Sequence, residues 1–224
     1  MLTFHTSDSS LLEIDVENLV IAGWAARDQE AVEAHIKELE ELGVPRPSSV
    51  PLFYRVAADR LTTASRLQVL GEESSGEVEA VLISDAEGKL WVAVGSDHTD
   101  RKVEAYSVAV SKQICPKPIS ADLWPFNEVA DHWDRLELRS HIIIEGRREL
   151  YQEGSLESLL HPSDLIRRHT GGDQLPPRTA LYCGTLTALG GVRPAEAFEM
   201  ELRDPLLGRS LRHTYELEVL PVVA

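Results

Sequence analysis

The sequence has few cysteines and no long hydrophobic run. Cys115 and Cys183 are its only cysteines and lie far apart, so no disulfide framework is expected and a reducing compartment fits best. No apolar stretch approaches the roughly 20 residues that a membrane-spanning helix needs. The first residues also lack the basic and apolar segments of a signal peptide. The sequence therefore predicts a cytoplasmic protein with no membrane partner.

Basic residues are also scarce. The 224 residues include 22 lysines and arginines against 37 aspartates and glutamates, which gives a formal net charge of -15. A protein that binds the phosphate backbone of a nucleic acid needs a basic surface, and this sequence has no basic cluster. A nucleic-acid partner is therefore not expected. The length and the hydrophobic content of 43% suit one large domain, or one domain with a small appendage.

Short apolar segments predict an α+β fold dominated by strands, without the regular β-α-β order of a doubly wound sheet. Residues 28–42 form the clearest predicted helix, which Asp28 can cap and which Gly43 and Pro45 end. Residues 155–169 predict a second helix with a break at Pro162, and 121–135 has helix-compatible spacing. Strands are predicted at 2–4 and 19–24 as a hairpin, at 52–56, over most of 66–114, as a pair within 136–154, and at 179–186, 198–202 and 211–219.

Two glutamates share one face of the strand predicted at 76–83. Side chains two residues apart in a strand point to the same side, so Glu77 and Glu79 point together. Apolar residues on both faces of the segment indicate a strand covered on both sides. Buried carboxylates need a partner, and Mg²⁺, Mn²⁺ or Ca²⁺ would supply one. The alternative is an exposed strand end with two solvated glutamates, which this segment alone favours.

Asp97 follows the next apolar strand, in the sequence Gly-Ser-Asp. The position just past a strand end is usual for a functional carboxylate, although an aspartate can also form a turn or cap a helix there. Glu199 and Glu201 have the same spacing as the first two glutamates but alternate with apolar residues. That pattern is typical of a strand with one face in water, so no site is expected at that second pair.

Together these segments resemble the fumarylacetoacetate hydrolase family. The segment Glu77-Val78-Glu79 resembles the Glu-x-Glu strand that supplies two metal ligands in that family. The segment 96–101 resembles its Asn-Asp-Val-Ser-Ala-Arg motif, whose aspartate is the third ligand. Segments at 51–56, 138–166 and 180–194 resemble further motifs in the family's order, so the resemblance covers residues 20 to 220 approximately. The sequence is also similar to a subgroup of this superfamily classed as a domain of unknown function.

The resemblance implies a fold and a chemistry. The fold would consist of mixed sheets rolled into a β-sandwich or pseudo-barrel with few helices, in a homodimer. Residues 1–45 would form an N-terminal part whose helix could act as a lid, and 46–224 would form the catalytic core. Glu77, Glu79 and Asp97 would hold one divalent cation, with Mg²⁺ as the first choice and Mn²⁺ or Ca²⁺ as alternatives. The protein would be a hydrolase or lyase (decarboxylase or tautomerase) acting on a small-molecule oxo acid or dicarbonyl compound.

The resemblance also assigns three catalytic residues. Lys112 would be the family lysine that stabilises an enolate, although it lies closer to Cys115-Pro116 than is usual in the family. His35 and Glu38 match a His-x-x-Glu pair on a helix that closes over the ligand. Residues three apart are neighbours on a helix, so the glutamate could orient the histidine as a general base. Without the resemblance, these residues would be assigned to exposed surfaces.

Four further residues would face the substrate according to the resemblance: His98, Arg101, Gly184 and Thr185. Each could instead be structural, as a hydrogen-bonded loop residue or as part of a closely packed strand end. Two further features depart from the family pattern. The interval from Glu79 to Asp97 is shorter than usual, and Cys-Gly-Thr-Leu replaces Thr-Gly-Thr-Pro. The departures at the lysine and at the Cys-Gly-Thr-Leu loop leave open a non-catalytic domain that binds a metal–carboxylate ligand or forms a dimer. A metal-free, acidic, β-rich protein is a third alternative.

Overall fold

Two β-sheets form the body of the protein in the computed structural model. The structure describes residues 1–41 and 46–223, except the side chains of residues 35, 38, 39 and 41. The eight-stranded central sheet has the order β2 (Leu11–Ile14), β1 (Leu2–Thr6), β12 (Asp122–Pro125), β9 (Leu90–Ser96), β8 (Val78–Ser84), β15 (Thr179–Thr185), β3 (Asn18–Gly23) and β4 (Leu52–Val56). The five-stranded second sheet has the order β14 (Arg147–Ser155), β13 (Glu137–Ile144), β16 (Ala197–Asp204), β17 (Arg209–Leu220) and β6 (Arg66–Leu70). The predicted strand-dominated α+β fold is confirmed.

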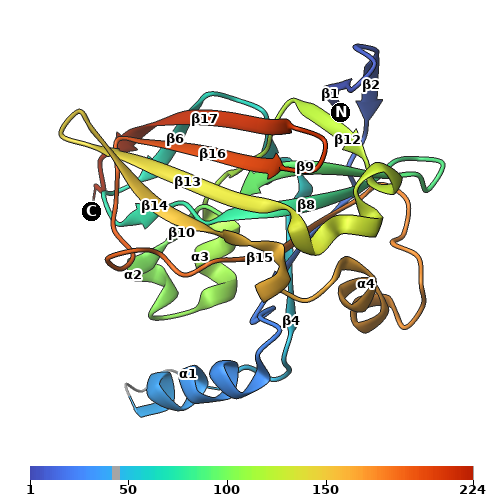
Figure 1. Ribbon diagram of the computed structural model, residues 1–224. Coiled ribbons are helices and arrows are strands. Elements are labelled where there is room, and N and C mark those ends of the chain that lie inside the picture. Colours follow the sequence, from blue (N-terminus) through green and yellow to red (C-terminus); the bar gives the residue numbers. More distant parts are fainter. Residues whose placement is uncertain (42–45, 224) are drawn as a thin grey trace.

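Helices and short strands lie around these sheets (Figure 1). The α-helices are α1 (Gln29–Glu41), α2 (Arg101–Glu104), α3 (Val108–Ile114) and α4 (Pro162–Thr170). The 3₁₀ helices span Ala58–Arg60, Phe126–Glu128, Ala130–Arg135 and Leu156–Ser158. Two small sheets pair β10 (Thr99–Asp100) with β7 (Ser74–Ser75), and β11 (Lys117–Pro118) with β5 (Leu61–Thr62). No helix in the described ranges has both the length and the apolar character that crossing a membrane requires.

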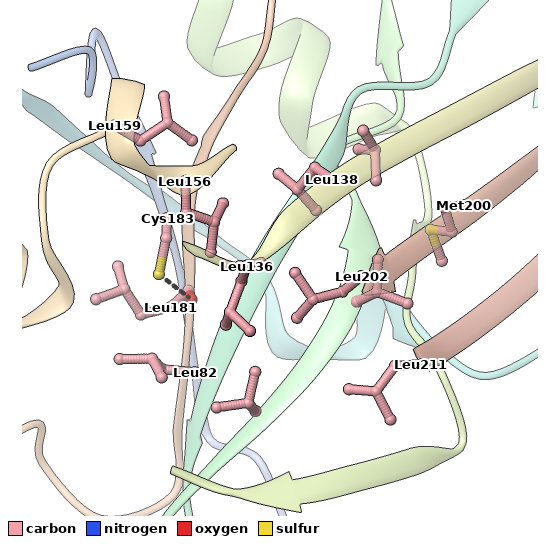
Figure 2. Close-up of a cluster of buried hydrophobic side chains, with 14 of the residues drawn as sticks. Leu82, Leu136, Leu138, Leu156, Leu159, Leu181, Cys183, Met200, Leu202 and Leu211 are labelled. Atoms are coloured by element: carbon pink, nitrogen blue, oxygen red, sulfur yellow. Dashed lines mark hydrogen bonds between the residues drawn. The ribbon is translucent and has the colours of Figure 1, made fainter. Parts of the chain in front are cut away.

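Strand β8 is buried along its whole length, as its apolar residues on both faces predict. One face packs against the second sheet. Figure 2 shows Leu82 and Leu181 of the central sheet beside Leu136, in the same cluster as Leu138 and Leu202. This shared core makes the two sheets a sandwich.

The opposite face of β8 contributes to a second cluster, which contains Val81 and Ile83. Phe4 of β1 and Val56 of β4 belong to the same cluster, although their strands lie near opposite ends of the sheet order. The central sheet must therefore curl around this cluster. The curl agrees with the predicted pseudo-barrel, because the sheet closes partly on itself.

Three predicted elements differ from the structure. Strand β1 pairs with β2, whereas β3 pairs with β15 and β4, so 2–4 and 19–24 do not form a hairpin with each other. Residues 101–114 are largely helical because Asp100 and Ser107 cap α2 and α3. Residues 121–135 begin as strand β12, because Leu123 and Trp124 are buried core residues, and continue as 3₁₀ turns.

The N-terminal residues contribute directly to the central sheet. Strands β1, β2 and β3 all precede residue 45 and all belong to that sheet. Helix α1 extends away from the body of the molecule, below β4 in Figure 1. A lid function for this helix stays a prediction.

Candidate metal centre

Three carboxylates converge where β8 begins and β9 ends. The antiparallel register pairs Val78 with Ser96, so Glu77 and Asp97 become neighbours, and the Asp97 N–H donates to the Glu77 carbonyl oxygen at 3.0 Å. Glu79 lies on the same face of β8 as Glu77 because side chains alternate along a strand. One carboxylate oxygen from each of these three acidic residues lies within 4.8 Å of the other two. The candidate carboxylate cluster is thus assembled by the pairing of two neighbouring strands.

The donor set fits a hard divalent cation. Glu79 is 2% exposed and Asp97 is fully buried, while Glu77 is partly exposed. Burial raises the pKa of Glu79 well above its ordinary value, and the negative charges of Asp97 and Glu77 raise it further. Oδ1 of Asp97 accepts no well-formed hydrogen bond among the described residues, and its charged neighbour is the Lys117 ammonium at 3.3 Å. Mg²⁺ and similar cations prefer oxygen ligands, so these residues could hold such an ion.

Cationic side chains also contact the cluster. Nζ of Lys112 bonds Oδ2 of Asp97 and lies 3.7 Å from Oε2 of Glu77. Nη2 of Arg101 lies 3.1 Å from Oε1 of Glu77. Burial alone would lower the pKa of Lys112, but the adjacent carboxylates raise it above its ordinary value. This lysine therefore remains charged beside the cluster.

Lys117 is a cluster contact that the sequence did not predict. Its side chain is fully buried, and Nζ lies 3.3 Å from Oδ1 of Asp97. The same ammonium donates to the carbonyl oxygens of His98 at 2.6 Å and Cys115 at 3.2 Å. Burial would raise the pKa of Asp97, yet the two lysines hold it below its ordinary value. A lysine between two prolines has no periodic pattern, so only the fold reveals this contact.

His98 is enclosed by protein groups. Nδ1 lies 3.0 Å from the Tyr215 hydroxyl and Nε2 lies 2.9 Å from Oγ of Ser74. Burial, reinforced by the positive charges of Lys117 and Arg101, lowers the pKa of His98 to about 3, so the ring is neutral. Contact between His98 and a substrate stays a prediction, and it would require one of these two hydrogen bonds to open.

Gly184 and Thr185 lie beside the cluster on β15. The Gly184 N–H donates to Oε2 of Glu79 at 2.7 Å, so it already orients a candidate ligand. A side chain at Gly184 would place its Cβ 2.8 Å from that of Ala25, and the backbone φ of +98° also favours glycine. The Thr185 hydroxyl donates to the Val78 carbonyl oxygen at 2.8 Å. Both donors have protein partners, and their contacts with a substrate stay predictions.

The structure thus brings together six of the predicted site residues: Glu77, Glu79, Asp97, Arg101, Lys112 and Gly184. His35 and Glu38 lie on helix α1, but their side chains lie outside the part of the chain that the structure describes. Their catalytic roles stay predictions.

Sequence comparison places the chain in a family. Residues 22–215 match the family described as "Protein of unknown function (DUF2848)". The chain belongs to the DUF2848 family. A comparison of the DUF2848 chain with curated proteins gave no match.

Solved structures share the fold of this DUF2848 protein. The hexagonal form of 2-keto-3-deoxyarabinonate dehydratase matches with a TM-score of 0.69 at 15% identity, over 93% of this chain and 75% of that one. A 2-keto-3-deoxy-D-arabinonate dehydratase complexed with magnesium and 2,5-dioxopentanoate gives 0.68 at 15% identity, with the same coverage. Cg1458 with inhibitor gives 0.65 at 16%, over 96% and 81%. These matches confirm the predicted fold, which resembles that of fumarylacetoacetate hydrolase, and they show the fold alone.

Proposed function

We propose that this DUF2848 protein is a divalent-cation-dependent enzyme that acts on a small oxo acid or dicarbonyl compound. The observation that carries the proposal is the convergence of Glu77, Glu79 and Asp97 beside the buried Lys112. The similarly folded dehydratase complexed with magnesium and 2,5-dioxopentanoate supports the same choice of cation and ligand class. Mg²⁺ is the proposed cation, with Mn²⁺ and Ca²⁺ as alternatives.

Each residue would have a separate task in the reaction. The three carboxylates would hold the cation, which when bound supplies Lewis-acid polarisation of the substrate carbonyl. Lys112 would place a fixed positive charge near the developing enolate oxygen. His35, oriented by Glu38, would take a proton from water in a hydrolytic reaction. Decarboxylation or tautomerisation would use the same enolate without that water.

Metal uptake and turnover test the proposal separately. Purified protein is assayed against oxaloacetate, acylpyruvates and other keto or hydroxy diacids, with and without Mg²⁺ or Mn²⁺. Glu79→Gln should abolish metal binding and turnover without unfolding the chain, because it removes one charged ligand. Glu199→Gln is the matched control, because that glutamate has the same spacing but pairs with Arg148 outside the cluster. Full metal occupancy in Glu79→Gln would contradict the ligand assignment.

A non-catalytic domain that binds a metal–carboxylate ligand is the second candidate. The observation that favours it is that the Gly184 N–H and the Thr185 hydroxyl already have protein partners. Metal binding without turnover of any oxo acid would support this candidate over the enzyme. The homodimer and the cytoplasmic location stay predictions, which light scattering and cell fractionation would test.

A further inference from the structure

A buried glutamine joins the second sheet to the central sheet beside the carboxylate cluster. Gln152 of β14 is 1% exposed. Its Oε1 accepts from the Val78 N–H at 2.9 Å and from the Ser140 hydroxyl at 3.0 Å. Its Nε2 donates to Oγ1 of Thr185 at 2.8 Å and to the Leu186 carbonyl oxygen at 2.6 Å. The amide thus uses both donors and both acceptor positions within the protein.

The glutamine lies where the main-chain pairing of β8 with β15 becomes irregular. The register is regular from Thr179 to Tyr182 and shifts before Thr185. Within this irregularity the Gly184 N–H bonds the Glu79 side chain, although a regular ladder would direct strand N–H groups to the neighbouring backbone. The interruption therefore supplies a hydrogen bond to a candidate ligand and removes main-chain pairing from β8.

Side chains replace the missing main-chain partners of β8. The Val78 N–H donates to Gln152, and the Val78 carbonyl oxygen accepts from the Thr185 hydroxyl. Gln152 also donates to that hydroxyl, so the three residues form a closed set of hydrogen bonds. A buried polar group that loses its hydrogen-bond partner destabilises the fold, so this arrangement restrains the strand.

We infer that Gln152 is a positioning residue for the carboxylate cluster. Val78 stands between Glu77 and Glu79, and fixing both of its peptide groups fixes the directions in which the flanking side chains leave the strand. Gln152 acts through Val78 and Thr185 and has no hydrogen bond to a carboxylate among the described residues. The inference rests on the proposed function, because it concerns the same cation site.

The test measures metal affinity and local backbone protection in matched variants. Mn²⁺ binding is measured by calorimetry, and exchange of the Val78 amide hydrogen by NMR, under conditions where every variant is folded. Gln152→Leu removes all four hydrogen bonds. Ser140→Ala is the control, because it removes one buried hydrogen bond to Gln152 and leaves those of Gln152 with Val78 and Thr185 in place. If Gln152→Leu does not fold, Gln152→Met, which also removes all four hydrogen bonds and keeps the length of the side chain, replaces it.

Gln152→Leu should bind Mn²⁺ about 10- to 100-fold more weakly, as is usual when a group that orients metal ligands is removed. Its Val78 amide should exchange faster, and Ser140→Ala should keep the wild-type dissociation constant. A wild-type dissociation constant in folded Gln152→Leu would overturn the inference, as would equal losses in both variants. If the wild-type protein itself bound no Mn²⁺, the proposed function would fail and the inference with it. The wild-type titration thus distinguishes the two failures.

Discussion

Lys112 and Asp97 are in direct contact at the carboxylate cluster, with Nζ of the lysine bonded to Oδ2 of the aspartate. The ammonium also lies 3.7 Å from Oε2 of Glu77, so one lysine contacts two of the three candidate ligands. Its side chain is 7% exposed, which limits screening by water. The lysine and a bound cation would therefore repel each other.

Lys112→Met should tighten Mn²⁺ binding while it lowers any turnover. Two unit charges about 4 Å apart interact by roughly 4 kcal/mol at an effective dielectric constant of 20, and about 1.4 kcal/mol is a tenfold change in affinity. We expect a gain in Mn²⁺ affinity of at least about tenfold, which is less than the full charge–charge energy would give, because the side chains will relax. Calorimetry measures the dissociation constant, and Lys102→Met on the neighbouring α2 is the exposed control. Weaker binding in Lys112→Met would contradict the prediction.

His35→Ala and Glu38→Ala should each lower kcat and leave the Mn²⁺ dissociation constant unchanged. Both residues lie on α1, which extends away from the central sheet that carries the carboxylates (Figure 1). Loss of a general base typically costs about 10²- to 10⁴-fold in rate. Lys37→Ala, on the same helix, is the control because that side chain is 67% exposed. Wild-type kcat in both alanine variants would remove this pair from the mechanism.

Asp204→Ala should destabilise the fold by about 3 kcal/mol, because it removes one partner of a buried charged network. Asp204 is fully buried and accepts from the Leu206 and Leu207 N–H groups, and His132 lies 3.1 Å away. The carboxylate thus ties the β16–β17 turn to the 3₁₀ helix Ala130–Arg135. Urea unfolding measures the difference, and Asp173→Ala on the exposed surface should leave the midpoint unchanged.

The stabilisation by Asp204 should also depend on pH. Burial would raise the pKa of Asp204, but the Leu207 N–H and His132 together lower it below its ordinary value of 3.8. Because the pKa of Asp204 is lower in the folded state, ionised Asp204 stabilises the fold fully above pH 3.8. This stabilisation is lost as the pH falls through the lowered pKa of the folded state. The stability difference between wild type and Asp204→Asn should therefore stay constant above that pH and shrink below it. If the stability difference between the two proteins stayed constant down to about pH 2, the lowered pKa of Asp204 would be refuted.

Neither thiol should react in the native protein at pH 8. Cys115 and Cys183 are both buried, and burial raises the pKa of Cys115 to about 11 and that of Cys183 further above its ordinary value. A thiol reagent such as dithionitrobenzoate should therefore label two groups per chain only after unfolding in urea. Rapid labelling of a folded chain would show that one of these cysteines is accessible.

Local patterns predicted the strands better than their partners. The apolar residues on both faces of 76–83 predicted a covered strand, and β8 is buried throughout. The pair of strands predicted within 136–154 likewise corresponds to the β13–β14 hairpin, whose partners are close in sequence. The pairing of β3 with β15 has no local signal, because register between distant strands depends on the complete core. Periodicity therefore identified elements but not their order in the sheet.

The same limit applies to the candidate site. Glu77 and Glu79 follow from strand alternation, whereas Asp97 was placed beside them only by family resemblance. The contacts of Lys117 and Gln152 were missed, because each depends on a segment that is distant along the chain or on an irregular strand end. Buried polar side chains become informative only when the fold shows which groups they contact.

The parallel pairing of β3 with β15 also determines when the central sheet can form during synthesis. Asn18 pairs with Thr179 and Ile21 pairs with Tyr182, so one neighbour of β8 leaves the ribosome only when most of the chain has been made. Until then, one edge of a strand that is wholly buried in the folded protein lacks its partner. Such non-local pairing slows folding and leaves strand edges open to aggregation. A ribosome-bound chain that ends before Thr179 is therefore the form of this protein with the greatest need for a chaperone.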